Sequence, residues 1–192
     1  MKKILVRVDF QNDFVHPKGH LTINAPQLIK KHKDFASRIT PEMFEQIIDT
    51  YDTHFEQTYP LTFESKSYPA HCLFGTFGWR HAAPLPESLP NIKIYKSTTN
   101  LFNEVPQYPF LSEDFTQTHI FLCGVLSEVC VKQALDGFLE RGATVTLIED
   151  LCQGLNEQIK DLIRHTYYRP YLQSGKLHTV QSHELFNERN KK

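Results

Sequence analysis

The chain has 192 residues, with 21 lysines and arginines against 22 aspartates and glutamates, and its formal net charge is -1. With 40% hydrophobic and 22% charged residues, the composition is typical of a globular core and excludes an intrinsically disordered chain. The near-neutral charge argues against a nucleic-acid or anionic-membrane partner, because such binding needs a surplus of basic residues on one face. A chain of this length predicts a single domain, which we place over residues 1–192.

The cysteine pattern and the N-terminus bear on the cellular compartment. The chain has four cysteines, none of them in a C-x-x-C pair, so we expect reduced thiols and no disulfide scaffold. The opening MKKILVRVDF begins like a signal peptide, but Arg7 and Asp9 interrupt its apolar part. No apolar run approaches the roughly 18 residues that a membrane span needs. We therefore expect a cytoplasmic protein.

Short apolar runs alternate with helical patterns along the chain. Strands are predicted at residues 3–9, 44–50, 92–95, 119–125, 143–150 and 177–181. Largely continuous apolar runs of this length are typical of parallel strands that are covered on both faces. The clearest helix begins at Ser127 and ends before Gly142, and another is predicted over 155–168. The alternation predicts a three-layer α/β/α sandwich with a mostly parallel, doubly wound sheet.

One segment departs from this alternation. Residues at about 52–90 are rich in proline, glycine and aromatic side chains and predict a long irregular loop. Loops of this length in a compact domain are usually functional.

Reactive side chains follow four of the predicted strands. They are Asp9 after the first strand, Asp52 and His54 after the second, Lys96 after the third, and Cys130 in the helix after the fourth. Ligands of open α/β sheets bind outside the carboxyl ends of the strands, so we expect these side chains to share one crevice. Each residue alone also fits an ordinary role as a turn cap, a solvated charge or a core thiol. It is their convergence that indicates an enzyme.

Together these residues form the parts of a thiol hydrolase. A cysteine attacks as the thiolate, and it needs a base to take its proton and a positive charge to hold it ionised. Cys130 stands in the first turn of a predicted helix, whose positive end favours the anion. Cys72, Cys123 and Cys152 lack that setting. We therefore predict Cys130 as the nucleophile.

Three motifs and one lysine carry a family resemblance. They are VDFQNDF (8–14), GHLTINAP (19–26), GVLSEVCV (124–131) and Lys96 after a strand. Over nearly the whole chain they resemble the isochorismatase-like cysteine hydrolases. Two further motifs, DTH at 52–54 and YPAHCLFGTFGW at 68–79, look like the metal site and signature loop of nicotinamidases within that superfamily. The resemblance implies an amidohydrolase that converts nicotinamide to nicotinate and ammonia in NAD salvage.

The resemblance also implies a role for each catalytic residue. Cys130 would attack the carboxamide carbon and form a thioester, while Asp9 would accept the thiol proton and return it to the departing ammonia. Lys96 would orient Asp9 and stabilise charge. The backbone N–H groups of Leu126 and Cys130 would form the oxyanion hole, and the peptide bond before Leu126 would be cis.

A metal site is implied in the same way. Asp52, His54 and His71 would bind one divalent ion, with Glu64 as a fourth ligand as in some nicotinamidases. This donor set suits zinc, manganese or iron, of which zinc is our first expectation. The ion, directly or through water, would receive the pyridine nitrogen and position the carboxamide over Cys130. Without His71 and the loop after it, the Asp-x-His pair would fit two solvated side chains.

Substrate-binding residues are the part of the site that the motifs define least. Phe14, Tyr68 and Phe102 are the expected aromatic neighbours of the substrate ring, and Phe102 fits core packing equally well. Many nicotinamidases carry D-x-Y-S-x-F after the catalytic lysine, whereas this chain reads KSTTNLF from residue 96. Ser127 and Glu128 stand where Thr-Asp is commoner.

These departures keep two alternatives open. The first is a related cysteine hydrolase that acts on another small amide or ureide, and the second is a catalytically idle binding protein on the same fold. The expected partner is a small-molecule amide, with no nucleic acid and no membrane, and a homo-oligomer is left open.

Overall fold

The computed structural model describes residues 1–187 and contains a six-stranded sheet in the order β3-β2-β1-β4-β5-β6. Every neighbouring pair in that order is parallel. The strands are β1 (Lys2–Val8), β2 (Gln46–Asp52), β3 (Ile92–Lys96), β4 (Thr118–Val125), β5 (Thr144–Gln153) and β6 (Leu177–Val180). Residues 188–192 lie outside the described part, and the single domain over 1–192 stays a prediction.

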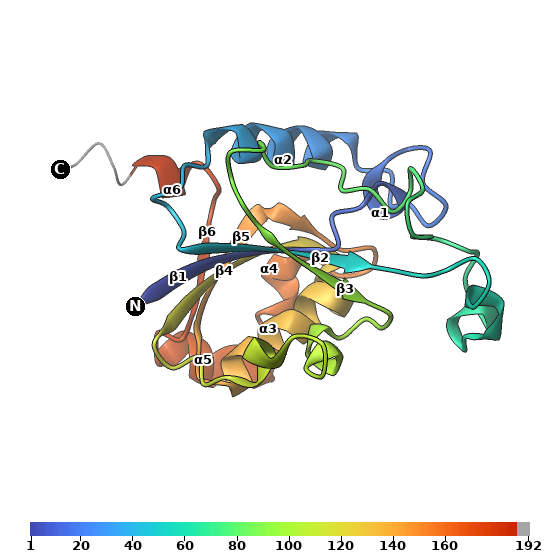
Figure 1. The fold of residues 1–192 in the computed structure, drawn as a ribbon. Helices are drawn as coiled ribbons and strands as arrows, with labels where there is room; N and C mark the ends of the chain where they lie inside the picture. The colour runs from blue at the N-terminus through green and yellow to red at the C-terminus, as the bar shows by residue number, and fades with distance from the viewer. Residues whose placement is uncertain (188–192) are drawn as a thin grey trace.

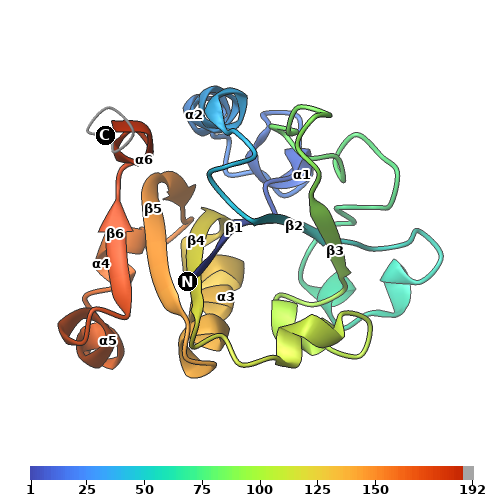
Figure 2. The same ribbon diagram turned by 60° about the vertical axis from the view of Figure 1, so that its left-hand side comes forward.

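Helices cover both faces of the sheet (Figure 1). One face carries α1 (Asn12–Val15), α2 (Pro26–Arg38) and α6 (Glu184–Asn187), and the other carries α3 (Lys132–Glu140), α4 (Ile159–Leu162) and α5 (Arg169–Gln173). Figure 2 shows the same layers from a second direction. The predicted α/β/α sandwich with a doubly wound parallel sheet is thus confirmed. Along residues 1–187, no helix combines the length and the apolar character that crossing a bilayer needs.

Shorter helical segments link the main elements. One of them, η5 (Ser127–Val131), is a π-helix that runs directly into α3. The others are 3-10 turns: η1 (Tyr59–Leu61), η2 (Glu64–Lys66), η3 (Leu101–Glu104), η4 (Pro109–Ser112) and η6 (Thr166–Tyr168). The helix predicted from Ser127 therefore forms, with a wider first turn. Segments of π-helix are rare and often lie at functional sites.

All six predicted strands form, and their bounds differ from the expected ones by three residues or fewer. Apolar residues of β1 and β4 are almost fully buried, which is why continuous apolar runs identified them. The continuous helix predicted over 155–168 is wrong. The chain forms α4, is extended at His165, and then restarts as η6 and α5. Pro170 lies in the first turn of α5, where a residue without an N–H group is tolerated, so it favours a new helix start.

The strand order reverses between β1 and β4. From β1 the chain moves outward through β2 to β3, and from β4 it moves the other way through β5 to β6. Ligands of such sheets bind outside the carboxyl ends of the strands at this reversal. The long connection between β2 and β3, residues 53–91, holds η1 and η2 and lies beside that edge.

A buried ion pair fastens this connection to the sheet. Arg7 on β1 donates from Nε and Nη2 to the two carboxylate oxygens of Asp49 on β2, both at 2.6 Å. Arg7 Nη1 also donates to Ala83 O at 2.9 Å, and Asn91 Nδ2 donates to Asp49. The guanidinium and the carboxylate are almost completely buried. Each charge is therefore compensated by the other, and Ala83 and Asn91 of the long connection supply further hydrogen bonds.

We expect Asp49→Ala to lower the free energy of unfolding by about 3–5 kcal/mol, because it leaves the Arg7 charge buried without a partner. Urea denaturation measures the change. Asp161→Ala is the matched control: it removes the partner of Arg164 in an exposed pair, and such pairs contribute about 1 kcal/mol or less. Equal losses in the two variants would contradict the assignment of Arg7 and Asp49 as a stabilising pair.

A second expected outcome concerns acid stability. His32 on α2 stacks on Phe10 at 3.5 Å, and burial lowers the pKa of its imidazole to about 3. The folded protein therefore keeps His32 neutral at pH values where the unfolded chain binds a proton, so stability falls as the pH falls below about 6.5. For His32 alone the loss at pH 5 is about 2 kcal/mol. In His32→Leu, unfolding measured between pH 7 and pH 5 should show a smaller loss than the wild type; an unchanged slope would contradict it.

Candidate active site

Three reactive side chains meet where β1, β3 and β4 end. Asp9 follows β1, Lys96 is the last residue of β3, and Cys130 lies in η5 after β4. Lys96 Nζ is 2.6 Å from Asp9 Oδ2 and 3.8 Å from Cys130 Sγ. The charge of the Asp9 carboxylate also acts on the Cys130 thiol. The structure therefore brings the three predicted catalytic residues together, with Lys96 in contact with both of the others, and all three are buried.

The sheet topology explains why a lysine occupies the third position. Strand β3 is separated from β1 by β2, and neighbouring strands lie about 4.8 Å apart. The long side chain of Lys96 spans β2 to reach Asp9. Its ammonium also donates to Thr98 O at 3.0 Å. The positive charge is therefore surrounded by a carbonyl oxygen, a carboxylate oxygen and the sulfur of Cys130.

Thr50 fixes the Asp9 carboxylate from the other side. Its hydroxyl donates to Asp9 Oδ1 at 2.6 Å and accepts a hydrogen bond from Asp9 N at 3.1 Å. Asp9 has a φ of 46°, in the left-handed region that residues other than glycine rarely adopt. Such backbone strain is found mainly at functional sites. Sequence reasoning missed Thr50, although a hydroxyl inside a buried strand signals a buried hydrogen bond.

The electrostatics set the resting protonation state. Burial on its own lowers the pKa of Lys96, but the neighbouring negative charges, that of Asp9 first, outweigh it and raise the pKa above its usual value. Burial raises the pKa of the Cys130 thiol well above its usual value; Lys96 opposes this shift and Asp9 adds to it. Burial and the nearby carboxylate therefore favour a neutral Cys130 thiol at rest, in place of the thiolate expected from its position at the start of a helix.

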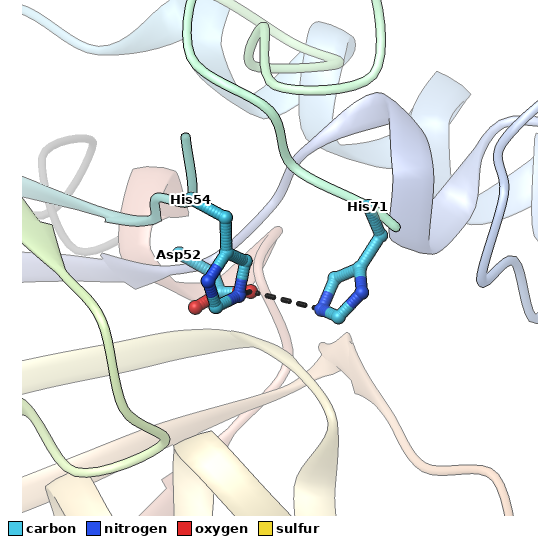
Figure 3. Close-up of side chains that lie close together, drawn as sticks. All are labelled: Asp52, His54 and His71. Carbon is cyan, nitrogen blue, oxygen red and sulfur yellow. Dashed lines mark hydrogen bonds and ion pairs between the residues drawn. The ribbon is translucent and has the colours of Figure 1, made fainter. Parts of the chain in front are cut away.

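A second cluster lies at the end of β2. Asp52 is the last residue of β2, His54 follows two residues later, and His71 comes from the long connection. The Nε2 atoms of His54 and His71 lie 3.1 and 3.2 Å from the same oxygen, Asp52 Oδ2. Figure 3 shows the three side chains converging on one point. Glu64 from η2 adds its carboxylate at 3.4 Å from His54 Nε2 and 3.6 Å from His71 Nε2.

The hydrogen-bond arrangement of this cluster suits a metal ion. Hydrogen bonds from the two histidines outweigh the effect of burial and hold the pKa of Asp52 below its usual value. The Nδ1 atom of His71 lies 2.8 Å from Pro69 O, and a carbonyl only accepts, so Nδ1 donates to it and Nε2, which faces Asp52, is the nitrogen that an ion would bind in place of a proton. The ligand atoms of Asp52, His54 and His71 all lie within 4.8 Å of one another. Two imidazoles and two carboxylates around one point fit zinc, manganese or iron.

One cavity of about 460 Å³ connects the two clusters. Its walls include Lys96 and Cys130 from the first cluster and Asp52, Glu64 and His71 from the second. A small molecule in this space can therefore contact Cys130 at one end and the imidazole–carboxylate cluster of Asp52, His54, His71 and Glu64 at the other. Sequence reasoning missed most of the remaining wall, because it comes from irregular segments without periodic patterns: Gly19, His20, Leu21, Thr22, Ile23, Leu155 and Asn156.

The expected oxyanion-hole residues also reach this space. Leu126 and Cys130 both line the cavity, and the Val125–Leu126 peptide bond is cis. Leu126 caps the π-helix that carries Cys130.

The three aromatic residues expected beside the substrate do not all lie at the cavity. Phe14 and Tyr68 line the cavity, whereas Phe102 does not. Phe102 packs on α3, 5.1 Å from the Phe138 ring, with Arg141 Cζ 4.0 Å above its own ring. Its ring fills the space beside Gly137, where a side chain would collide with it. The expectation for Phe102 is therefore corrected: η3 turns this ring towards α3 and away from the cavity.

One family model and several solved structures match this chain. The family model described as Isochorismatase domain matches residues 3–166. A search of curated proteins finds no match.

Among solved structures, the chain is similar to a pyrazinamidase of Pyrococcus horikoshii in complex with zinc, with a TM-score of 0.70, 25% identity, and coverage of 94% of this chain and 99% of that one. A nicotinamidase of Bacillus subtilis gives a TM-score of 0.68 at 18% identity, covering 94% and 100%. An isochorismatase family protein of Desulfovibrio vulgaris gives 0.69 at 16% identity, covering 99% of each chain.

The last two similarities concern the fold alone, since their sequence identity is low. The family match is of a different kind, because it covers most of the sequence, including Asp9, Lys96 and Cys130. The chain belongs to the isochorismatase family.

Proposed function

We propose that this hydrolase is a nicotinamidase, which converts nicotinamide to nicotinate and ammonia. The observation that carries the proposal is the single cavity that joins the Asp9, Lys96 and Cys130 cluster to the imidazole–carboxylate cluster. The first cluster has the groups for covalent amide hydrolysis, and the second has ligands for an ion that can orient a heteroaromatic ring. The similarity to a pyrazinamidase in complex with zinc supports the same assignment.

In the proposed first half-reaction, Cys130 Sγ attacks the carboxamide carbon as its proton passes to Asp9. The negative charge that develops on the amide oxygen is received by the N–H groups of Leu126 and Cys130, and such donors stabilise a transition state by about 3–4 kcal/mol each. The C–N bond then breaks, and the Asp9 proton goes to the nitrogen, which leaves as ammonia. The product of this half-reaction is a thioester on Cys130.

In the second half-reaction a water molecule attacks the thioester carbon and gives a proton to Asp9. The C–S bond breaks, the proton returns to Cys130 Sγ, and nicotinate is released. Lys96 keeps its positive charge throughout, because the negative charges around it hold its pKa high. Its role is to fix the Asp9 carboxylate and to stabilise the sulfur when it carries charge.

Asp52, His54, His71 and Glu64 would hold one divalent ion, zinc being our first choice. A bound ion supplies an acceptor for the lone pair of the ring nitrogen. Phe14 and Tyr68 in the cavity wall would contact the faces of the ring. These contacts orient the carboxamide towards Cys130, and orientation of this kind removes much of the entropic barrier.

A related cysteine hydrolase of another small amide is the second candidate. Thr99 lines the cavity and belongs to the KSTTNLF segment, in which this chain departs from many nicotinamidases. The Desulfovibrio protein also shares the fold without being named a nicotinamidase. The two candidates share Cys130 chemistry and differ in the molecule that enters.

The decisive test is ammonia release from nicotinamide by purified protein, before and after chelation and after metal is added back. We expect release from nicotinamide and pyrazinamide that is lost on chelation and restored by zinc, because the ring nitrogen needs its acceptor. Aliphatic amides serve as the comparison. Turnover of aliphatic amides without turnover of nicotinamide would favour the second candidate.

A further expected outcome concerns the nucleophile. Cys130→Ala should lower kcat by about 10³-fold or more, because no other group can form the thioester, and should leave the melting temperature nearly unchanged. Cys152→Ala is the matched control, since Cys152 is also a buried thiol and does not line the cavity. Activity in Cys130→Ala comparable to that of the control would exclude Cys130 as the nucleophile.

A further inference from the structure

Tyr59 is a buried aromatic residue that the catalytic scheme does not use. It opens η1 in the long connection between β2 and β3, and only 4% of it is exposed. Phe55, Leu61 and Phe63, from the same stretch of chain, are at least half exposed. Tyr59 is thus the large aromatic side chain of this stretch that points inward.

The ring of Tyr59 contacts both histidines of the imidazole–carboxylate cluster. Its centroid lies 4.9 Å from the His54 ring at an interplanar angle of 74°, and 5.6 Å from the His71 ring at 82°. The two imidazoles lie 5.0 Å apart at 70°. Edge-to-face contacts of this kind are favourable and directional. The phenol ring thus limits the orientations that both imidazoles of Figure 3 can adopt.

The hydroxyl of Tyr59 holds the segment that carries His71. It lies 3.0 Å from Tyr68 O, 3.0 Å from Pro69 O and 3.4 Å from His71 Nδ1. Both carbonyls only accept, so the phenol proton is donated to them. The His71 Nδ1 proton is donated to Pro69 O, and the phenol oxygen faces the same proton. This arrangement keeps a proton on Nδ1, so that Nε2, which faces Asp52, is the nitrogen that an ion would bind.

We propose that Tyr59 is a positioning residue of the metal site, which fixes the rings of His54 and His71 and the tautomer of His71. The inference rests on the proposed metal-binding role of these histidines. Partners that orient ligating imidazoles raise metal affinity by about 10–100-fold. Tyr59 performs this function from outside the ligand set, and its hydroxyl also fixes the backbone of Tyr68, which lines the cavity.

The test is the zinc affinity of Tyr59→Phe, measured by competition with a chromophoric chelator on metal-free full-length protein. We expect zinc to bind about 10–100-fold more weakly than to the wild type, because the hydroxyl that holds Pro69 and His71 is lost while the ring remains. In the cobalt-loaded protein, the visible absorption bands should shift, since they report the ligand arrangement. Both readouts are independent of any amide substrate.

Tyr168→Phe is the matched control. Tyr168 is equally buried, and its hydroxyl donates to Asp136 Oδ1 at 2.7 Å, in a part of the fold that does not line the cavity. It should lose stability without losing zinc affinity. His71→Ala, which removes a ligand, sets the scale for a larger loss.

Three results would overturn the proposal. They are wild-type zinc affinity in Tyr59→Phe, an equal loss in Tyr168→Phe, and absence of zinc binding by the wild-type protein. Failure of the protein to hydrolyse nicotinamide would overturn the proposed function alone, because zinc affinity is measured without substrate.

Discussion

The contact between Lys96 Nζ and Asp9 Oδ2 is the interaction on which the site depends. At 2.6 Å and out of contact with solvent, it links the ends of two strands that are not neighbours in the sheet. A buried pair of this kind contributes little net stability, because desolvation offsets the attraction, but losing either partner is severe. It also affects where protons reside. The Lys96 ammonium offsets the negative charge of the Asp9 carboxylate, which acts on the Cys130 thiol.

Strand β2 serves two purposes through the alternation of its side chains. Asp49 faces Arg7 and joins the sheet to the long connection between β2 and β3. Thr50 and Asp52 point instead towards the two side-chain clusters of the candidate site. Successive residues of a strand point to opposite faces, so one strand can carry a structural charge and functional groups without conflict. The strand therefore couples the packing of the long connection to the two clusters. A loss of register by one residue would exchange the two sets.

Much of the fold and part of the site could be predicted from the sequence. Parallel strands are continuous apolar runs, and residues that follow them gather at one edge, which is why Lys96 and Cys130 were predicted to meet. Strand order has no local signal and came only from the structure. Thr50 acts through hydrogen bonds to Asp9, which is 41 residues away in the sequence. Tyr59 acts through hydrogen bonds and ring contacts within an irregular segment. No periodic pattern reveals either. Phe102 follows Lys96 closely in sequence, but the 3-10 turn η3, in the connection between β3 and β4, decides which way its ring points.

The neutral thiol of Cys130 has a consequence for the lifetime of the protein. Peroxides oxidise cysteine through its thiolate, and susceptibility also follows exposure. Because burial raises the pKa of Cys130, the resting protein presents little thiolate to such oxidants. In the proposed mechanism, the sulfur becomes nucleophilic only when an electrophilic carbon lies beside it and Asp9 takes the proton. The burial that raises the pKa of Cys130 thus also protects its thiol from irreversible oxidation.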